Sequence, residues 1–372
     1  MRIIVMGGAG DMGSRAVEEL SRTEGIGQVT IADRNRKAAS RIAEHLKGRN
    51  AKVDVATVDA NDHAGLVRAM KRYDIAASAL GPFYLFEAKL VAAALEAGVH
   101  YASINDDWLA AEQVITRFSD KAREKGITVI TGLGTSPGIS NVGVRHFANQ
   151  MDRLRRVEIS VYLPLDGGGG EAVIGHTLFI TSGRIALWRE GRRMMVPACS
   201  EERRLDFPRF GRQKVWNMGH GEPVTVPLFI PGLEEVNFFM GFGKDSNLIV
   251  APARWGLFNG QTRRRVFTKL FYWMHRLGKG KVPEWGAVRI DAWGEKDGRA
   301  VYRQAFGIGQ MREATGLSLA VGTIMLARGE TLNDRGGVYA PEACLDPVRF
   351  LTYLKERGIP SYYDLEMRQP VV

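Results

Sequence analysis

A glycine pattern close to the amino-terminal end constrains the fold of this chain more than any other feature. The pattern G-x-G-x-x-G directly follows the apolar run Arg2–Met6 and reads Gly8-Ala9-Gly10-Asp11-Met12-Gly13. The first glycine permits a tight turn, the second lets a pyrophosphate approach the main chain, and the third lets a helix pack close to the sheet. Free N–H groups at the start of that helix attract phosphate. The motif therefore predicts a strand, a turn and a helix that bind a dinucleotide.

Short β-branched runs alternate with amphipathic stretches as far as residue 145. Strands are expected at Arg2–Met6, Gln28–Ala32, Ala51–Thr57, Asp74–Ala79, Val99–Ser103 and Ile127–Thr131. Helices are expected between them at Gly13–Arg22, Arg36–Leu46, Asp62–Met70, Leu85–Ala97 and Ala110–Lys125. This alternation is typical of a parallel sheet with helices on both faces. It predicts an α/β Rossmann domain over residues 1–145.

The residues after the second expected strand bear on the choice of cofactor. Asp33 lies 20 residues after Gly13, where a carboxylate can accept hydrogen bonds from the ribose hydroxyls of NAD. Arg34 and Arg36 suit the 2′-phosphate of NADP instead. Both cofactors stay open, and the carboxylate favours NAD. A glycine turn without any ligand is the alternative, and the acidic residue in its expected place argues against it.

Two later segments fit the same interpretation. Asp59 follows the third expected strand, where it can accept from the adenine amino group or simply cap the next helix. The loop after the fourth strand has the position of a wall beside the nicotinamide, although it can also be an ordinary Gly-Pro turn. Its cofactor-binding candidates are Ala79, Leu80, Gly81 and Pro82.

The pattern changes near residue 146, and strands with a period of two follow. They are expected at Arg156–Leu163, Val224–Phe229, Val236–Gly241, Asn247–Ala251, Ala287–Trp293 and Ala300–Ile308, with a flexible tip at the glycine run 167–170. Such strands predict a mostly antiparallel sheet in a second α+β domain over residues 146–315. The pattern is helical again at Gly316–Ala327 and Pro347–Arg357, within a third segment that spans residues 316–372.

Composition and charge exclude several classes of protein. The chain has 51 Lys and Arg against 41 Asp and Glu, a net charge of +10, which favours anionic partners. Its two cysteines do not suggest a disulfide scaffold, and the start resembles no signal peptide, so we expect a cytoplasmic protein. Cys-x-x-Cys, His-Glu-x-x-His and nucleic-acid-binding modules are absent from the sequence, so we expect neither a metal nor a nucleic acid.

Two basic segments, Arg184–Lys214 and Thr262–Lys281, allow more than one interpretation. In the second, Phe267, Leu270 and Trp273 lie at helical spacing among arginines. Such a helix can rest on an anionic membrane surface, or it can be a solvated face over a core stripe. The sequence favours the core stripe. Cys199, in the first segment, is either activated by neighbouring cations or buried and inert, and the inert thiol is favoured.

Several short runs recur in the same order in a known family. They are Gly81-Pro82-Phe83, the stretch 97–101, the run Gly132–Asn141, Gly175-His176 with Thr181–Gly183, and Gly336–Val338 with Pro341-Glu342. With the glycine turn, they make the chain similar to the saccharopine dehydrogenase-like family of NAD(P)-dependent enzymes, from the amino terminus to about residue 358. Saccharopine reductase, lysine 6-dehydrogenase and carboxynorspermidine dehydrogenase belong to that family.

The resemblance implies a Rossmann domain, a second domain that covers the substrate and often builds a homodimer, and terminal helices that return to the first domain. It also implies reversible hydride transfer at a carbon–nitrogen bond of an amino acid, imine or polyamine derivative. The chain departs from its relatives at Ser136, at His176 and after Tyr101. These departures motivate one alternative, a nicotinamide-binding regulatory protein without turnover. The aromatic and basic segment motivates another, a membrane-surface reductase of lipid-like substrates.

Candidate substrate residues follow from the same runs and from charge. Amine oxidation needs a base, and the candidates are Asp106, Tyr101 and His176, although Asp106 and Asp107 can instead cap a helix. The backbone N–H groups of Gly134–Asn141 can cradle a carboxylate, and Arg184 can bind one with two hydrogen bonds. The expected substrate-binding residues are Ser136, Pro137, Gly138, Asn141, Thr181, Ser182 and Arg184.

Overall fold

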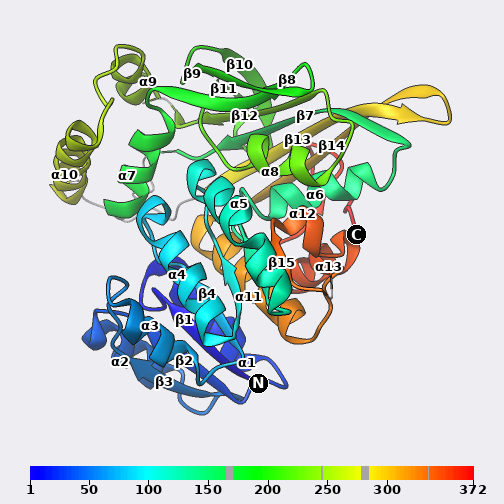
Figure 1. The fold of residues 1–372 in the computed structure, drawn as a ribbon. Helices are drawn as coiled ribbons and strands as arrows, with labels where there is room; N and C mark the ends of the chain where they lie inside the picture. Colours follow the sequence, from blue (N-terminus) through cyan, green and yellow to red (C-terminus); the bar gives the residue numbers. More distant parts are fainter. Residues whose placement is uncertain (165–170, 244–245, 278–284, 334) are drawn as a thin grey trace. The chain divides into compact units, whose positions relative to one another are not determined.

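The computed structural model describes residues 1–164, 171–243, 246–277, 285–333 and 335–372. These residues form two compact units (Figure 1). The first unit contains Met1–Val142 and Arg312–Gly358, and the second contains Gly143–Met311 and Ile359–Val372. The glycine run 167–170, expected as a flexible tip, lies outside the described residues.

The first unit is built on a parallel sheet. Its strands are β1 (Arg2–Met6), β2 (Gln28–Ala32), β3 (Lys52–Ala56), β4 (Ile75–Ser78), β5 (His100–Ser103), β6 (Thr128–Thr131) and β15 (Gly337–Tyr339). They lie in the order β3-β2-β1-β4-β5-β6-β15, and each recorded pairing is parallel. From β1 the chain adds β2 and β3 on one side, and it then adds β4, β5 and β6 on the other side of β1. The crevice between β1 and β4, where this order reverses, is where a Rossmann sheet binds its ligand. The predicted α/β fold is confirmed.

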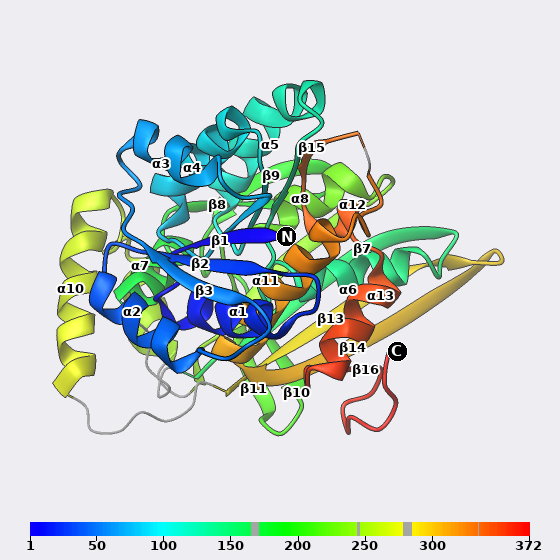
Figure 2. The same ribbon diagram turned by 90° about the horizontal axis from the view of Figure 1, so that it is seen from below.

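Helices cover both faces of this sheet. The helices of this unit are α1 (Asp11–Arg22), α2 (Arg36–His45), α3 (His63–Met70), α4 (Phe83–Ala97), α5 (Trp108–Glu124), α11 (Met311–Ala327), α12 (Pro341–Cys344) and α13 (Pro347–Glu356). Helix α6 (Ile139–Ala148) starts in the first unit and continues into the second, whose core includes its Val144 and Phe147. Figure 2 shows α3, α4 and α5 on one face and α1, α2 and α11 on the other. Local signals place their ends, because Asp62 caps α3 and Gly98 closes α4 with a left-handed φ of 77°.

Helix α11 packs directly on α1. A Cβ on Gly316 would lie 2.6 Å from the Cβ of Arg15, so only glycine allows this approach. The guanidinium of Arg15 pairs with Glu313 at 2.5 Å, and that of Arg357 pairs with Glu19 at 2.7 Å. Ion pairs of Arg15 and Glu19 on α1 with Glu313 and Arg357 thus join the two chain segments of the first unit.

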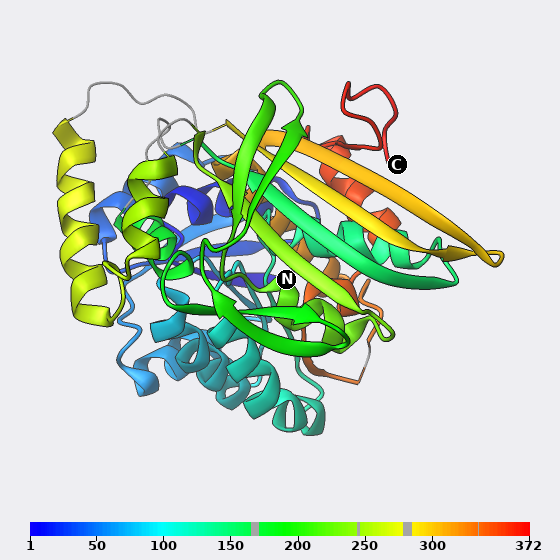
Figure 3. The same cartoon turned by 90° about the horizontal axis from the view of Figure 1, so that it is seen from above.

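The second unit contains a mixed sheet. Its strands are β7 (Arg153–Tyr162), β8 (Arg184–Arg189), β9 (Arg192–Pro197), β10 (Glu202–Phe207), β11 (Gly211–Asn217), β12 (Glu235–Gly241), β13 (Trp285–Lys296), β14 (Arg299–Gln310) and β16 (Ser361–Tyr362). The central order is β10-β11-β12-β7-β13-β14-β16, and β8 adds to β12 and β9. β7 and β12 are parallel, and the other described pairs are antiparallel. Figure 3 shows the long β13–β14 hairpin beside β7. The mostly antiparallel sheet was predicted correctly.

Two expected strands of this unit are helices instead. Val224–Phe229 lies in α8 (Glu222–Phe229), and Asn247–Ala251 lies in α9 (Ser246–Arg254). Both predictions were wrong because a short apolar run has no period that separates a strand from a buried helix. Prolines also stand inside both helices, at Pro227 and Pro252. Two further helices are α7 (Glu171–Ile180) and α10 (Gln261–Leu277).

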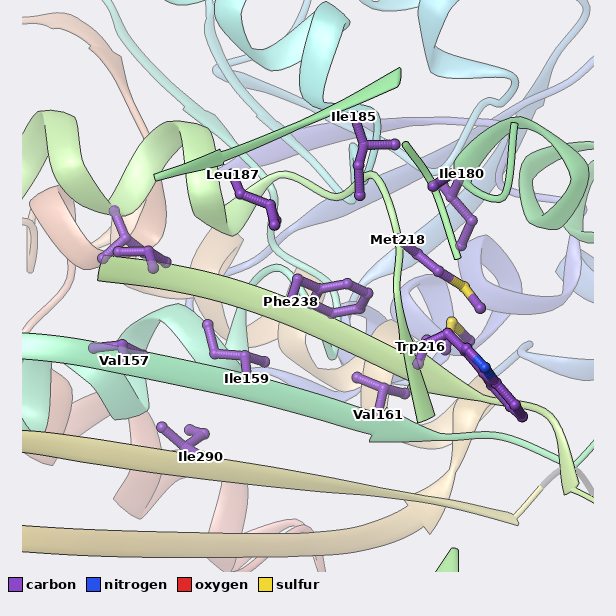
Figure 4. Close-up of a cluster of buried hydrophobic side chains, with 14 of the residues drawn as sticks. Val157, Ile159, Val161, Ile180, Ile185, Leu187, Trp216, Met218, Phe238 and Ile290 are labelled. Carbon is purple, nitrogen blue, oxygen red and sulfur yellow. The ribbon is translucent and has the colours of Figure 1, made fainter. Parts of the chain in front are cut away.

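A large apolar core stabilises the second unit. Figure 4 shows how side chains from several strands converge within it. Its labelled members are Val157, Ile159, Val161, Ile180, Ile185, Leu187, Trp216, Met218, Phe238 and Ile290, and all belong to one buried cluster. Strands β7, β8, β11 and β12 thereby share one interior, and α7 and α8 add to it through Ile180 and Val226. Among the described residues, no helix is long and apolar enough to cross a membrane.

Candidate functional site

The glycine turn joins β1 to α1 through contacts that exclude side chains. A Cβ on Gly13 would lie 2.3 Å from the carbonyl oxygen of Gly7, and one on Gly8 would lie 2.9 Å from that of Val5. Gly7 itself adopts a φ of +70°, a conformation that favours glycine. The turn is therefore closed on its inner side by the backbone, and helix α1 starts directly against it.

The outer side of the turn is bare. A Cβ on Gly10 would meet, within 4 Å, only the oxygen of Gly7, at 3.4 Å. Gly10 is also the N-cap of α1, and no side chain caps the helix there in the described structure. An uncapped helix start beside exposed main chain is a site for a phosphate anion. The residues present fit the pyrophosphate of a dinucleotide.

Asp33 stands at the end of β2 and contacts this turn. Its Oδ2 accepts a hydrogen bond from the N–H of Ala9 at 3.2 Å, and its Oδ1 accepts one from the N–H of Asn35 at 2.8 Å. The half-buried carboxylate is thus fixed in one orientation. Arg34 and Arg36 are exposed, and neither pairs with a described carboxylate. The segment after β2 therefore carries both an oriented carboxylate and exposed arginines.

The loop after β4 lies against the same turn. The Cβ position of Gly7 is 2.9 Å from the carbonyl oxygen of Ala79, and the N–H of Ala79 donates to Met6 at 2.9 Å. The N–H of Leu80 donates to the hydroxyl of Ser78 at 3.3 Å. Gly81 and Pro82 follow, and α4 begins after Pro82. The structure thus brings the loop 79–82 and the glycine turn together.

Asp59 lies outside these contacts. Its exposed carboxylate accepts from the N–H of Asn61 at 2.8 Å, and the cap of α3 is Asp62 instead. Asp59 is therefore held in a local turn, and its carboxylate keeps free acceptor sites.

A buried carboxyl group that the sequence analysis missed lies under the ends of β5 and β6. Glu87 of α4 is fully buried and accepts from three hydroxyls. The donors are Ser103 at 2.5 Å, Tyr101 at 2.9 Å and Thr131 at 3.0 Å. Burial raises the pKa of the Glu87 carboxyl above its ordinary value of 4.5, although these hydrogen bonds oppose the shift.

Tyr101 belongs to this cluster rather than to an open site. Its ring is fully buried, and burial together with the neighbouring Glu87 raises its pKa well above 10. Asp107 is the N-cap of α5 and accepts from the N–H groups of Leu109 and Ala110, as its capping interpretation predicts. Asp106, beside it, is half-buried. Of these three residues, Asp106 has the most accessible side chain.

The turn between β6 and α6 is closed by its own hydrogen bonds. The N–H of Gly134 donates to Pro137 at 2.8 Å, that of Ile139 donates to Gly134 at 3.1 Å, and that of Gly138 donates to Asn141 Oδ1 at 3.1 Å. A Cβ on Gly138 would lie 2.0 Å from Gly134. The N–H groups expected to cradle a carboxylate are thus largely used within the turn. Asn141 is buried and donates to Glu342 at 2.8 Å, whereas Ser136 is half-buried.

Three expected substrate residues follow α7 in the second unit. The buried hydroxyls of Thr181 and Ser182 donate back to carbonyls of α7, at Thr177 and Leu178. Arg184 is exposed at the start of β8 and donates to the carbonyl of Met195. The two hydroxyls therefore satisfy carbonyls in the last turn of α7, and Arg184 is the member of this group with a solvent-accessible charge.

His176, on α7, lies beside a second histidine that the sequence analysis did not select. Its ring centroid is 6.1 Å from that of His220, at an angle of 75°. His220 Nδ1 lies 2.5 Å from Glu222 Oε2, and its ring stacks on Phe238 at 4.0 Å. His220 and Glu222 are both buried. A carboxylate that holds one ring nitrogen fixes the tautomer and presents the other nitrogen for proton transfer.

Neither cysteine has the features of a reactive thiol. Both are free and buried, and burial raises the pKa of each thiol to about 12. The nearby Arg254 lowers the value for Cys199 only in part. The burial expected for Cys199 is confirmed. Within the described ranges, no group of His, Cys, Asp and Glu side chains could hold a metal ion.

Comparison with protein families identifies the amino-terminal unit. Residues 3–130 match the saccharopine dehydrogenase NADP-binding domain, so this unit binds a nicotinamide dinucleotide. Carboxynorspermidine synthase from Vibrio cholerae is 27% identical over 263 residues, which cover 63% of this chain and 62% of that protein. Carboxyaminopropylagmatine dehydrogenase from Synechocystis is 24% identical, and the alignment covers 97% of each chain. The chain thus spans less than two thirds of the carboxynorspermidine synthase that it matches.

Solved structures share the fold at low identity. Saccharopine dehydrogenase (L-Glu forming) from Saccharomyces cerevisiae matches with a TM-score of 0.69 and 15% identity, over 96% of this chain and 98% of that one. DAP dehydrogenase from C. glutamicum matches with a TM-score of 0.51 and 10% identity, over 94% and 95% of the two chains. The expected resemblance to the saccharopine dehydrogenase-like family is confirmed.

Proposed function

We propose that this chain, which belongs to the saccharopine dehydrogenase-like proteins, is an NAD(P)-dependent oxidoreductase. Its reaction is hydride transfer at a carbon–nitrogen bond of an amino acid, imine or polyamine-like substrate. The observation that carries the proposal is the bare, uncapped turn at Gly10, with Asp33 bonded to it through Ala9. Relatives named for carboxylated amines support the substrate class.

The first unit would hold the cofactor. Gly8, Gly10, Asp11, Met12 and Gly13, at the glycine turn and the start of α1, would hold the pyrophosphate. Asp33 and Arg34 would contact the adenosine ribose, Asp59 would contact the adenine, and Ala79–Pro82 would border the nicotinamide. We favour NAD because a carboxylate fixed at this position repels a 2′-phosphate. The description of the matched domain as NADP-binding, and the free Arg34 and Arg36, favour NADP.

The bound cofactor supplies or accepts the hydride, and the protein must position the substrate and move a proton. We assign proton transfer to His176 and the neighbouring His220, with Glu222 as the positioning carboxylate. Asp106 stays a second candidate. Arg184 and Ser136 are the proposed contacts of the substrate carboxylate. For Tyr101 we propose a structural role, because its hydroxyl is buried and donates to Glu87.

Pro137, Gly138, Asn141, Thr181 and Ser182 are proposed to shape the substrate segments through the hydrogen bonds described above. The small-molecule substrate agrees with the relatives. A homodimer and a cytoplasmic location are also proposed, and light scattering of the purified protein tests the dimer.

A fluorescence titration with NADH and NADPH, followed by turnover assays, tests the proposal. We expect saturable binding of at least one coenzyme, and turnover with an amine, amino acid or imine in a panel that includes carboxylated polyamines. If neither coenzyme binds, the dinucleotide site is wrong. If a coenzyme binds tightly and no substrate reacts, the chain is a nicotinamide-binding regulatory protein.

A further inference from the structure

Seven large apolar side chains are exposed on α9, on α10 and on the turn between them. We call this set the α9–α10 surface: Leu248, Trp255, Leu257, Val266, Leu270, Trp273 and Met274. Trp255 is 88% exposed and Trp273 is 59% exposed. Figures 1 and 3 show α9 and α10 as neighbouring helices at the edge of the second unit. Large exposed apolar patches mark sites of interaction, whereas apolar side chains scattered singly over a surface are ordinary.

Helix α10 has two apolar faces rather than one. Phe267 and Phe271 pack against the core of the second unit, and Phe267 meets Phe258 edge-on at 5.3 Å. This face is the core stripe that the sequence favoured. Val266, Leu270 and Trp273 lie on a different face and are 60%, 43% and 59% exposed. One apolar face is enough to pack a helix on the protein core, so a second apolar face on α10 indicates that a binding partner covers it.

The charge of this segment is entirely positive. Residues 246–277 contain no Asp or Glu, and their Lys and Arg residues are Arg254, Arg263, Arg264, Arg265, Lys269 and Arg276. Arg263, Arg265 and Lys269 are exposed, and none has a carboxylate partner in the described part of the chain. The sheet of the same unit differs. There Arg189 pairs with Glu201 and Arg289 pairs with Asp291, each at 2.7 Å.

Exposed apolar side chains together with unpaired cations indicate which partner binds this surface. If a second copy of the chain bound to this surface, unpaired arginines and lysines of the two copies would repel each other, in a protein with a net charge of +10. An anionic membrane instead offers negative headgroups to the cations and an acyl boundary to the apolar side chains. Tryptophan also prefers the depth at which headgroups and acyl chains meet.

We propose that the α9–α10 surface docks this protein onto an anionic lipid bilayer. Helix α10 lies along the membrane plane, with Val266, Leu270 and Trp273 inserted between headgroups and with Arg265 and Lys269 paired to them. The inference goes beyond the proposed oxidoreductase function and does not depend on it. It differs from a membrane span, since α10 keeps Phe267 and Phe271 in the protein core.

Vesicle flotation of the full chain tests this proposal. We expect the protein to float with vesicles of phosphatidylcholine and phosphatidylglycerol at low salt, and to stay behind with phosphatidylcholine alone. High salt should release it, because screening weakens the pairing of cations with headgroups. Failure to float with the anionic vesicles at low salt overturns the proposal.

Matched variants locate the binding surface. Val266→Glu places a carboxylate on the α9–α10 surface, and Val348→Glu makes the same change on α13, where Val348 is 51% exposed. The first variant should lower the partition coefficient about tenfold, and the second should leave it unchanged. Lys269→Gln should lower it about fivefold on anionic vesicles only. Equal flotation of the two valine variants overturns the assignment.

Two further measurements separate the rival explanations. Light scattering shows whether Val266→Glu changes the oligomeric state, and a change there without any loss of flotation means that this face joins two copies, which overturns the membrane proposal. Coenzyme titration of Val266→Glu should match the wild type, because Val266 and the proposed cofactor residues belong to different units. The membrane proposal can therefore fail while the oxidoreductase proposal stands.

Discussion

The Oδ2 atom of Asp33 accepts a hydrogen bond from the backbone N–H of Ala9 at 3.2 Å. This bond joins the carboxylate proposed for the ribose to the turn proposed for the pyrophosphate. The second oxygen is held by Asn35 at 2.8 Å, so the side chain is oriented before any ligand arrives. An oriented group loses less freedom on binding, and this adds to affinity.

Replacing this carboxylate should change the choice of coenzyme. Asp33→Ala removes a charged acceptor of the ribose hydroxyls, so we expect NADH affinity to fall about tenfold. NADPH should bind no worse, since the repulsion of its 2′-phosphate is also lost. Coenzyme fluorescence gives both dissociation constants. Asp120→Ala, at a side chain that is 89% exposed on α5, is the control. An unchanged ratio of the two constants would refute the role of Asp33.

Alanine substitutions at two glycines of the same turn should affect different properties, stability at Gly13 and coenzyme binding at Gly10. Gly13→Ala forces a Cβ to within 2.3 Å of a carbonyl oxygen, so the free energy of unfolding should fall by about 1–3 kcal/mol. Gly10→Ala meets only one atom, at 3.4 Å, so the fold should persist while the methyl group obstructs the pyrophosphate. Urea unfolding and coenzyme titration separate the two effects. Normal coenzyme binding by a folded Gly10→Ala protein would contradict the proposed site.

The sequence predicted the first unit well because each of its elements carries a local signal. The strand Gln28–Ala32 was predicted with its observed bounds, and Asp62 and Gly98 marked helix ends through the chemistry of capping. The parallel sheet followed from the alternation of strands and helices, whereas the late strand β15 was not predicted. Helix α8 was predicted as a strand because Val224–Phe229 is a short apolar run without a helical period, and the burial of Glu222–Val226 is a property of the tertiary structure.

The same reason explains which site residues were missed. Glu87 sits in an apolar helix, and only the fold brings it to Ser103 and Thr131, 16 and 44 residues away. His220 was missed because Val224–Phe229 was predicted as a strand. Without a helix starting at Glu222, there was no reason to pair Glu222 with His220. A glycine on each side of His220, followed by Glu222-Pro223, is a helix-start signal that could have found them.

Glu87 should tolerate an amide better than an apolar side chain. Glu87→Gln keeps one acceptor oxygen and places an NH2 group beside hydroxyls that can also accept, whereas Glu87→Leu removes both oxygens to which the three buried hydroxyls donate. We expect Glu87→Leu to lower the free energy of unfolding by about 1–3 kcal/mol per unsatisfied group, and Glu87→Gln to change it far less at neutral pH. Urea titration gives both values. Equal destabilisation by the two variants would show that volume, not hydrogen bonding, matters here.

The pH dependence of that comparison has a definite sign. The pKa of Glu87 is raised in the folded protein above 4.5, so the folded state binds more protons than the unfolded state above that pH. Its contribution to stability is therefore present below pH 4.5 and is lost as the pH rises toward the folded value. Glu87→Gln does not titrate. The stability of the wild type relative to Glu87→Gln should fall as the pH rises, and a rising or flat difference would contradict the raised pKa.

Glu222 offers the sharpest test of the proposed proton transfer. Glu222→Gln removes the charge that orients His220, so we expect kcat to fall about 10²-fold while the coenzyme dissociation constant stays unchanged. Glu222→Asp, which keeps the carboxylate, should recover part of the loss. Glu190→Gln is the control, since that side chain is 72% exposed in the same unit. A purely structural carboxylate would lower the melting temperature and leave the pH profile of turnover in place. Removing a carboxylate that positions His220 for proton transfer should instead alter that profile.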